Sequence, residues 1–169
     1  HLGVRRQRQM CIRDRGYTDG RRPDNVTFGN DIAEDLARRD FTINAMAIEP
    51  MKGLVGEECP SGKLIDLGGR GVEDLQSGLL RTVGRAEERI GEDGLRIVRA
   101  FRFLDLREGG LREFDPELSA AISSNLQMLS KVSKERIWNE LQRVLSCSNS
   151  MRIVESMVEH GIFEEILPG

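Results

Sequence analysis

The sequence predicts an α+β protein, with a mixed sheet in its first half and only helices in its second half. Up to about residue 86, short apolar or alternating stretches are separated by glycine and proline turns, a pattern typical of strands. After residue 87, apolar residues recur at three- and four-residue intervals, which predicts helices. The chain has 169 residues, 31% charged and 38% apolar, so it can bury a substantial core.

Residues 1–15 differ from the rest because they contain five arginines, one acidic residue and no clear periodicity. Three interpretations compete for this segment: a basic tail, a surface strand, or sequence that does not belong to the gene. The string QRQMCIRDR resembles translated sequencing-adapter read-through found at the ends of metagenomic assemblies. We favour that third interpretation and exclude the segment from the functional argument.

Turn residues and apolar patterns predict several short elements between residues 16 and 86. Asp31, followed three residues later by Glu34, is a candidate N-cap for a short helix. Alternate residues are apolar from Phe41 to Ala47, which predicts a strand ended by Pro50. We further expect strands at 26–28, 64–67 and 79–83, a loop at 51–62 and a glycine turn at 68–71.

The most informative stretch of the second half is Ile90–Leu104, in which three arginines recur at strict three-residue spacing. They are Arg96, Arg99 and Arg102. In an α-helix, at about 100° per residue, the apolar side chains would share one side and the arginines the other. Leu95 and Phe103 would project among the arginines, as expected if the basic side faces a cleft.

Asp93 lies one turn before Arg96, so this helix would present a carboxylate and a guanidinium side by side. Such a pair can hydrogen-bond the edge of a nucleobase, and the later arginines can hold phosphates. The alternative is an i,i+4 ion pair between Glu92 and Arg96 on a solvated face, and spacing alone favours it.

Three further helices are expected toward the C-terminus. The first begins at Asp115–Pro116, a cap and first-turn signal, and the second is capped by Ser133. The third ends at Gly161. The second helix carries an apolar stripe and Trp138, which we expect to be a packing residue rather than a platform on which a base stacks. The stripe consists of Ile137, Leu141, Val144 and Leu145.

Composition excludes several classes of protein. The net charge of −3 argues against non-specific binding to nucleic acid, so RNA binding would need local basic patches. Cys11, Cys59 and Cys147 are odd in number and widely spaced, which predicts free thiols rather than disulfides or a zinc site. No apolar run approaches the ~18 residues of a membrane span, so we expect a cytoplasmic protein without a membrane partner.

Arg38–Asn44, with the sequence RRDFTIN, is the second informative stretch. Two arginines at the entrance to a strand, followed by Thr42 and Asn44 on one face, would place phosphate donors beside a ribose-binding amide. The pattern fits equally well a helix C-terminus with basic residues followed by an edge strand. The glycine-rich Asp66–Gly71 lacks the spacing of a nucleotide-binding loop and predicts a structural turn.

Several motifs together resemble one family in their order and separation. RRDFTINAMA, the IDLGG…EDL segment and EDGLRIVRAFRF resemble motifs B, C and D of the class II tRNA nucleotidyltransferases (CCA-adding enzymes) and the related bacterial poly(A) polymerases. The resemblance covers about residues 16–168. It implies the C-terminal part of a polymerase-β-like nucleotidyltransferase head at 16–86. At 87–169 it implies an incomplete helical neck that recognises nucleotides and binds RNA.

The resemblance to motif B implies that Arg39 contacts the incoming nucleotide and that Asp40 and Asn44 shape its sugar and phosphate pocket. In the segment that resembles motif C, Leu67 stands where the family has a proline. That segment is a hinge between head and neck in the family, so its flexibility is expected to differ.

The resemblance to motif D implies that Asp93 and Arg96 read the Watson–Crick edge of CTP or ATP, so that protein rather than nucleic acid acts as the template. Arg99 and Arg102 match the following arginines, which are expected near the triphosphate or in support of the pocket. Because the motif occurs in its family context, we interpret these arginines as functional rather than solvated.

The family's chemistry also depends on motif A, whose Asp-x-Asp pair holds two Mg²⁺ ions, and no Asp-x-Asp occurs in the 169 residues. The resemblance therefore implies an internal fragment with a nucleotide pocket, without catalytic residues or metal ligands, and inactive alone. The parent would transfer CMP and AMP from CTP and ATP to the tRNA 3′ end. Alternatives are a poly(A) polymerase fragment acting on other RNA 3′ ends, a non-catalytic nucleotide- or RNA-binding module, and a structural helical adaptor.

Overall fold

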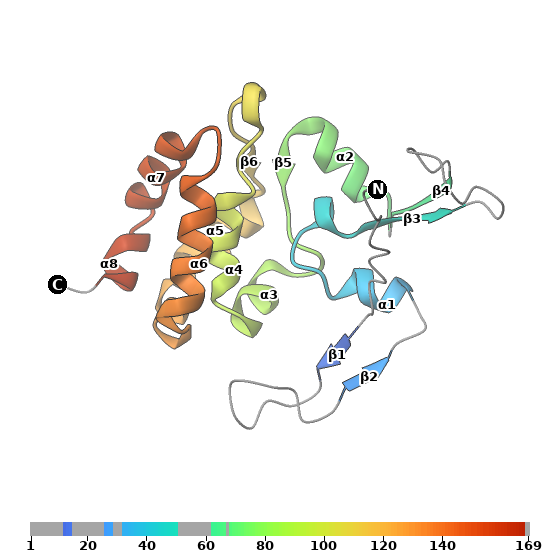
Figure 1. Cartoon of the computed structure of the whole chain (residues 1–169), viewed down its shortest axis with the longest axis horizontal. Helices are drawn as coiled ribbons and strands as arrows, with labels where there is room; N and C mark the ends of the chain where they lie inside the picture. The colour runs from blue at the N-terminus through green and yellow to red at the C-terminus, as the bar shows by residue number, and fades with distance from the viewer. Residues whose placement is uncertain (1–11, 15–25, 29–31, 51–61, 67, 168–169) are drawn as a thin grey trace, which may run out of the picture.

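The computed structural model describes residues 12–14, 26–28, 32–50, 62–66 and 68–167. Figure 1 shows short strands and helices on one side of the molecule and a bundle of helices on the other. The α+β class predicted from the sequence is confirmed, and the described strands form three two-stranded sheets. Some expected features lie outside the described residues. They are the Asp31 cap, the loop at 51–61, Leu67, Cys11 and Cys59.

The first sheet pairs β1 (Ile12–Asp14) with β2 (Val26–Phe28) in antiparallel orientation. The strand expected at 26–28 is therefore present. Its partner β1 falls in the segment that we set aside, and the pairing agrees with the surface-strand interpretation of that segment.

The second sheet is an antiparallel pair in which Met46 lies opposite Asp66 and Ile48 opposite Leu64. It follows a short helix, as the cap signal predicted, and a 3₁₀ turn. The elements are α1 (Ile32–Ala37), η1 (Thr42–Asn44), β3 (Met46–Pro50) and β4 (Gly62–Asp66).

The strand predicted from Phe41 to Ala47 is wrong over Thr42–Asn44, which form η1. The Thr42 hydroxyl donates a 2.6 Å hydrogen bond to buried Asp74, and the Thr42 N–H donates to the Arg81 carbonyl at 3.0 Å. These contacts with segments far along the chain draw the backbone out of the extended conformation. An alternating pattern of apolar residues cannot predict hydrogen bonds to segments so far along the chain.

The glycine turn is structural, as expected. Gly68 and Gly69 have positive φ angles of 81° and 71°, which glycine adopts without strain. They turn the chain into α2 (Arg70–Ser77), and the Asp66 carboxylate accepts the N–H groups of Gly71 and Val72 at 3.1 and 2.9 Å. Asp66 thereby satisfies two amides of the first helical turn and fixes the end of β4 against α2.

The single helix predicted over 90–104 is wrong, because two helices meet there at a break. α3 (Ala86–Glu92) ends at Asp93, whose backbone is extended, and α4 (Leu95–Arg102) begins after Gly94. A Cβ on Gly94 would lie 2.5 Å from the Met128 carbonyl oxygen, so the backbones approach more closely there than any side chain allows. The break turns Asp93 out of the helical face on which we had placed it.

β6, which is the one strand after α4 in the part of the chain that the structure describes, pairs in parallel with β5 and joins the two halves of the chain. The Asp115 carboxylate accepts the Glu117 N–H at the start of α5, and the Ser133 hydroxyl accepts the Arg136 N–H at the start of α6, as the cap signals predicted. The elements are β5 (Leu79–Leu80), η2 (Arg107–Gly109), β6 (Glu113–Phe114), α5 (Pro116–Ser124), η3 (Leu126–Lys131), α6 (Lys134–Leu145), α7 (Ser150–Glu159) and α8 (Ile162–Ile166).

Two expectations about α6 are wrong. Trp138 is 56% exposed and Leu145 is 60% exposed, whereas Ile137 and Val144 are buried. α6 packs against α4 and α7, and Trp138 and Leu145 lie outside the faces that these contacts bury. The buried face includes Glu140, a carboxylate that the apolar stripe did not include.

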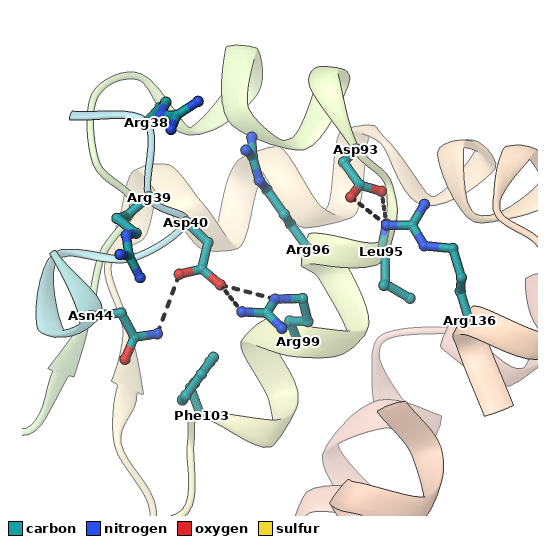
Figure 2. Close-up of a pocket in the computed structure, with 10 residues that line it drawn as sticks. All are labelled: Arg38, Arg39, Asp40, Asn44, Asp93, Leu95, Arg96, Arg99, Phe103 and Arg136. Carbon is teal, nitrogen blue, oxygen red and sulfur yellow. Dashed lines mark hydrogen bonds and ion pairs between the residues drawn. The ribbon is translucent and has the colours of Figure 1, made fainter. Parts of the chain in front are cut away.

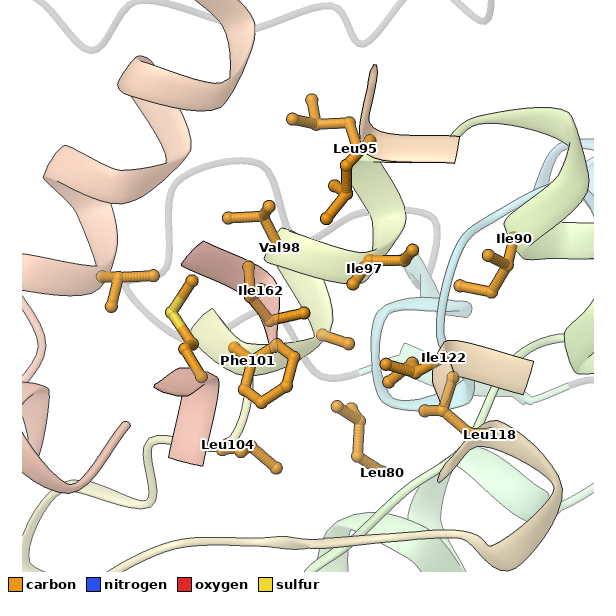
Figure 3. Close-up of a cluster of buried hydrophobic side chains, with 14 of the residues drawn as sticks. Leu80, Ile90, Leu95, Ile97, Val98, Phe101, Leu104, Leu118, Ile122 and Ile162 are labelled. Atoms are coloured by element: carbon orange, nitrogen blue, oxygen red, sulfur yellow. The ribbon is translucent and has the colours of Figure 1, made fainter. Parts of the chain in front are cut away.

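The core lies around α4, whose Ile97, Val98 and Phe101 are fully buried among side chains from the surrounding helices (Figure 3). The Phe101 ring makes edge-on contacts with Phe114 and His160, each at 5.2 Å between ring centres.

Cys147 has a free thiol, as expected. Within the described ranges, no helix combines the length and apolarity needed to cross a bilayer.

Substitution Gly94→Ala is expected to lower the free energy of unfolding by about 1–3 kcal/mol, because its Cβ would force the Met128 backbone or the α3–α4 break to move. Urea unfolding measures the effect. Gly91→Ala in α3 is the matched control, since its Cβ meets no atom within 4 Å, and it should raise stability by about 0.5–1 kcal/mol. Equal effects of the two substitutions would contradict the role assigned to Gly94.

Candidate functional site

A cleft of about 510 Å³ separates the end of α1 and η1 from the α3–α4 break, α4 and α6 (Figure 2). Its wall is mostly charged, with a smaller apolar part. The lining residues are Arg38, Arg39, Asp40, Asn44, Asp93, Leu95, Arg96, Arg99, Phe103 and Arg136. Leu95 and Phe103 provide the apolar part, as expected for a basic helix face that borders a cleft.

Six of the seven residues selected from the sequence line this cleft. Three come from the RRDFTIN stretch and three from the stretch around α4, and Asp40 and Arg99 meet although 59 residues separate them. The seventh, Arg102, is not among the lining residues. The two stretches with the most informative sequence patterns thus form opposite walls of one cavity.

Asp40 holds these two walls together. It is 9% exposed, and its Oδ1 accepts the Phe41 N–H at 2.9 Å and the Asn44 side-chain amide at 3.2 Å. Its Oδ2 accepts both Nε and Nη2 of Arg99. Burial raises the pKa of Asp40, but the Arg99 charge and these hydrogen bonds outweigh burial and lower the pKa below its ordinary value.

Arg99 contacts a second carboxylate on its other side. Its Nη1 lies 3.4 Å from Glu140, which is 3% exposed and also contacts Arg102 at 3.0 Å and Arg143 at 2.5 Å. The Arg99 guanidinium is therefore bound by carboxylates from both α6 and the segment after α1. In this structure it positions Asp40, and it does not offer an unpaired charge to a phosphate.

Arg102 has a supporting position outside the cleft. Its guanidinium lies 4.2 Å from the centre of the Phe103 ring and pairs with Glu140. Desolvation lowers the pKa of Arg102, and the neighbouring Glu140 charge partly opposes that shift. Of the two roles that the resemblance left open, support of the pocket agrees with this geometry and direct contact with a triphosphate does not.

Asp93 and Arg96 both line the cleft, but each has a protein partner. Asp93 Oδ1 accepts the Leu95 N–H at 3.1 Å and Oδ2 accepts Arg136 Nη2 at 2.7 Å (Figure 2). Arg96 Nη1 donates to Glu92 at 2.5 Å and to the Arg89 carbonyl at 2.6 Å. The i,i+4 ion pair considered as the alternative is therefore present. Among the described residues, Arg96 Nε and Nη2 have no acceptor, so the guanidinium can bind a further group.

Arg38 and Arg39 supply positive charge on the opposite wall. Asp35 accepts from Arg38 Nη2 at 3.1 Å and from Arg39 Nη2 at 2.7 Å, so one carboxylate orients both arginines. In total the cleft is lined by five arginines and two aspartates, so positive side chains outnumber negative ones on its wall. In the described part of the chain, no group of three or more His, Cys, Asp or Glu side chains is placed to hold a metal ion.

Sequence analysis considered Arg38 with Arg39 as a phosphate donor, but it did not consider Arg136 or Glu140 for the site. Glu140 could have been found, because it lies at helical spacing from buried Ile137 and Val144 and is therefore a carboxylate on an apolar face. Arg136 had no comparable signal, since its partner Asp93 is 43 residues away.

Family models identify both halves of the chain. Residues 10–81 match the poly(A) polymerase head domain, and residues 113–169 match the probable RNA- and SrmB-binding site of polymerase A. The CCA-adding enzyme of Lactobacillus johnsonii is 42% identical over 154 residues, or 91% of this chain. The chain belongs to the family of tRNA nucleotidyltransferases and poly(A) polymerases. The head match begins at residue 10, within the segment set aside at 1–15.

Solved members of the family share the fold. The Bacillus stearothermophilus CCA-adding enzyme in complex with CTP superposes with a TM-score of 0.68 at 35% identity, over 81% of this chain and 31% of that one. A tRNA nucleotidyltransferase complexed with a primer tRNA and an incoming ATP analog gives a TM-score of 0.70 at 33% identity, over 88% and 40%.

The chain spans about a third of the length of its relatives, 35% for the enzyme of L. johnsonii and 35% for the CCA-adding enzyme of Bacillus licheniformis, which is 40% identical over 153 residues. This agrees with the expectation of a fragment of a nucleotidyltransferase. The boundary expected near residue 87 stays a prediction.

Asp40→Asn is expected to lower the free energy of unfolding at neutral pH by about 2–3 kcal/mol, because Arg99 would lose a charged acceptor. Because the pKa of Asp40 is lowered in the folded state, its stabilising effect is present above the unfolded-state pKa and is lost as pH falls through the folded-state pKa. The variant should therefore lose less stability than the wild type on acidification.

Urea unfolding at a series of pH values from neutral to acid measures both effects. Glu159→Gln, at an exposed carboxylate on α7, serves as the control and should change neither. An acid dependence in Asp40→Asn identical to that of the wild type would refute the role assigned to the Asp40–Arg99 pair.

Proposed function

We propose that the cleft is the nucleotide pocket of an RNA nucleotidyltransferase that adds CMP and AMP, from CTP and ATP, to the 3′ end of tRNA. The observation that supports this most directly is the meeting of Asp93 and Arg96 with Arg39 and Asn44 around one cavity. Relatives of this chain are named CCA-adding enzymes, and related structures contain CTP, ATP or primer tRNA. We place the activity in the cytoplasm, where tRNA and its nucleotide substrates occur.

Hydrogen-bond chemistry explains how one site could accept both nucleotides. The Watson–Crick edges of cytosine and adenine each carry an amino donor next to a ring nitrogen that accepts. In our proposal the Asp93 carboxylate accepts from the amino group, and Arg96 donates to the ring nitrogen through Nε or Nη2. Uracil and guanine have a carbonyl and a ring N–H in the corresponding positions, so both contacts would be repulsive.

The opposite wall supplies the contacts for the sugar and phosphates. Arg39, with Arg38 beside it, gives the cleft its positive charge near Asn44, whose amide is oriented by Asp40. Asn44 and Arg39 are the residues we propose for the ribose and the phosphates. We assign Arg99 and Arg102 to support of this wall, since their guanidinium groups already contact carboxylates.

Transfer itself needs metal-bound carboxylates, which nucleotidyltransferases use to activate the primer hydroxyl and to stabilise the leaving pyrophosphate. The described residues contain no cluster that fits a metal ion. We therefore propose that Mg²⁺ acts in the longer parent through ligands outside these residues, and that this chain contributes only recognition of the nucleotide.

A poly(A) polymerase fragment is the second candidate, because both matching family models carry the name of that enzyme. The two functions require different nucleotide preferences of the pocket. Comparable affinities for CTP and ATP would support CCA addition, whereas a strong preference for ATP would support poly(A) addition. A non-catalytic module would bind nucleotide or RNA in an intact gene product without transferring it, and a structural adaptor would bind neither.

Arg96→Ala is expected to weaken binding of CTP and ATP about 10- to 100-fold, because a charged hydrogen bond to the base contributes about 1.5–3 kcal/mol. Equilibrium titration with each nucleotide measures the change. Arg85→Ala removes an exposed arginine that pairs with Glu88 away from the cleft, and it should leave both affinities unchanged. Unaltered affinities in Arg96→Ala would refute its role in reading the base.

The 169-residue chain, supplied with Mg²⁺, CTP, ATP and a primer tRNA, is expected to incorporate no nucleotide, because it lacks an Asp-x-Asp pair. Gel analysis of labelled primer measures incorporation, and titration of the same preparation tests whether it binds CTP. Measurable turnover would contradict the argument from the missing carboxylates.

A further inference from the structure

We propose that Arg136 is a specificity-determining residue, which acts by positioning the carboxylate of Asp93 toward the base. The inference rests on the proposed function, in which Asp93 accepts a hydrogen bond from the amino group of cytosine or adenine. It adds a residue from α6, which neither the sequence motifs nor the family resemblance had assigned to the site.

The geometry supports a direct role in orientation. Arg136 Nη2 donates to Asp93 Oδ2 at 2.7 Å, while the Leu95 N–H donates to Asp93 Oδ1 at 3.1 Å. The two donors come from different elements, α6 and the first turn of α4, so together they fix the plane of the carboxylate. Figure 2 shows the Arg136 side chain extending from α6 to Asp93 at the edge of the cleft.

The helix that carries Arg136 is firmly anchored. The Ser133 hydroxyl caps its first turn by accepting the Arg136 N–H at 3.4 Å, and Ile137 and Val144 are buried. One turn after Arg136, buried Glu140 pairs with Arg99 at 3.4 Å. α6 therefore contacts both ends of the pocket wall formed by α4, which suits it to hold Asp93 in one place.

The pair adds little to the stability of the fold, because it is accessible to solvent. The Arg136 side chain is 52% exposed and that of Asp93 is 33% exposed, and ion pairs of this kind are weak in water. The Arg136–Asp93 pair instead orients the Asp93 carboxylate. Each carboxylate oxygen still has a free lone pair after it has accepted one hydrogen bond. An Asp93 held by two donors can present those lone pairs to an amino group in a fixed direction.

The consequence concerns discrimination between bases. A fixed, ionised carboxylate favours the amino groups of CTP and ATP and repels the carbonyl groups of UTP and GTP. Without Arg136, only the Leu95 N–H orients Asp93, so the carboxylate can rotate away from a carbonyl oxygen. Removal of Arg136 should therefore affect the rejection of UTP more than the affinity for CTP.

The test measures dissociation constants of CTP and UTP for the 169-residue chain with wild-type sequence and with Arg136→Gln, Arg136→Lys, Asp93→Asn and Arg136→Gln/Asp93→Asn. Arg136→Gln is expected to lower the UTP-to-CTP ratio of dissociation constants about five- to tenfold, as loss of a charge-assisted hydrogen bond does. Arg136→Lys, which keeps the charge, should restore part of the ratio, and it decides the question if Arg136→Gln does not fold. Lys134→Gln, the same charge change on α6 outside the cleft, is the matched control and should leave the ratio unchanged.

A positioning role also predicts that the two substitutions are not additive. Once Asp93→Asn has removed the carboxylate, Arg136→Gln should lower the ratio no further. If the wild type prefers CTP and Arg136→Gln preserves that preference, or if the effects add, the inference is wrong and the proposed function stands. If the wild type itself does not prefer CTP to UTP, the proposed base recognition fails, and the inference fails with it.

Discussion

The two halves of this chain are joined at the cleft by a row of alternating charges, in which the buried carboxylates of Asp40 and Glu140 flank the partly buried guanidinium of Arg99. Asp40 follows α1, Arg99 lies on α4 and Glu140 lies on α6, so three separate elements meet through one guanidinium. Buried charges are tolerated only when they are paired and hydrogen-bonded. Because each of these groups needs the others, the relative placement of α1, α4 and α6 is tightly constrained, and with it the position of both cleft walls.

A second constraint is the break between α3 and α4. The contact of Gly94 with the Met128 backbone interrupts the helix, and the Asp93 backbone becomes extended. The break allows Asp93 to turn toward Arg136 while Arg96 remains on α4 and caps the α3 carbonyl of Arg89. A continuous helix would have set the carboxylate and the guanidinium by helical spacing alone. In the broken form each is positioned by its own partner.

These constraints explain how a chain with a net charge of −3 gathers five arginines around one cleft. The positive charge is local: the arginines of the cleft are each held by a carboxylate or a carbonyl that fixes the side chain. Asp35 orients Arg38 and Arg39, and Asp40 orients Arg99. Similarity to nucleotidyltransferases agrees with this chemistry, and the geometry assigns different tasks to arginines that look equivalent in the sequence.

The sequence by itself determined the α+β class, the capped starts of α5 and α6, and the two stretches that form the cleft, because caps, periodicity and local motifs are encoded within a few neighbouring residues. Tertiary structure alone decided the break at Gly94, the 3₁₀ turn at Thr42 and the exposure of Trp138. It also decided the pairing of Arg99 with Asp40 and Glu140 and that of Asp93 with Arg136. Each of these features depends on a contact with a segment that is distant in the chain, and a local sequence pattern cannot predict such a contact.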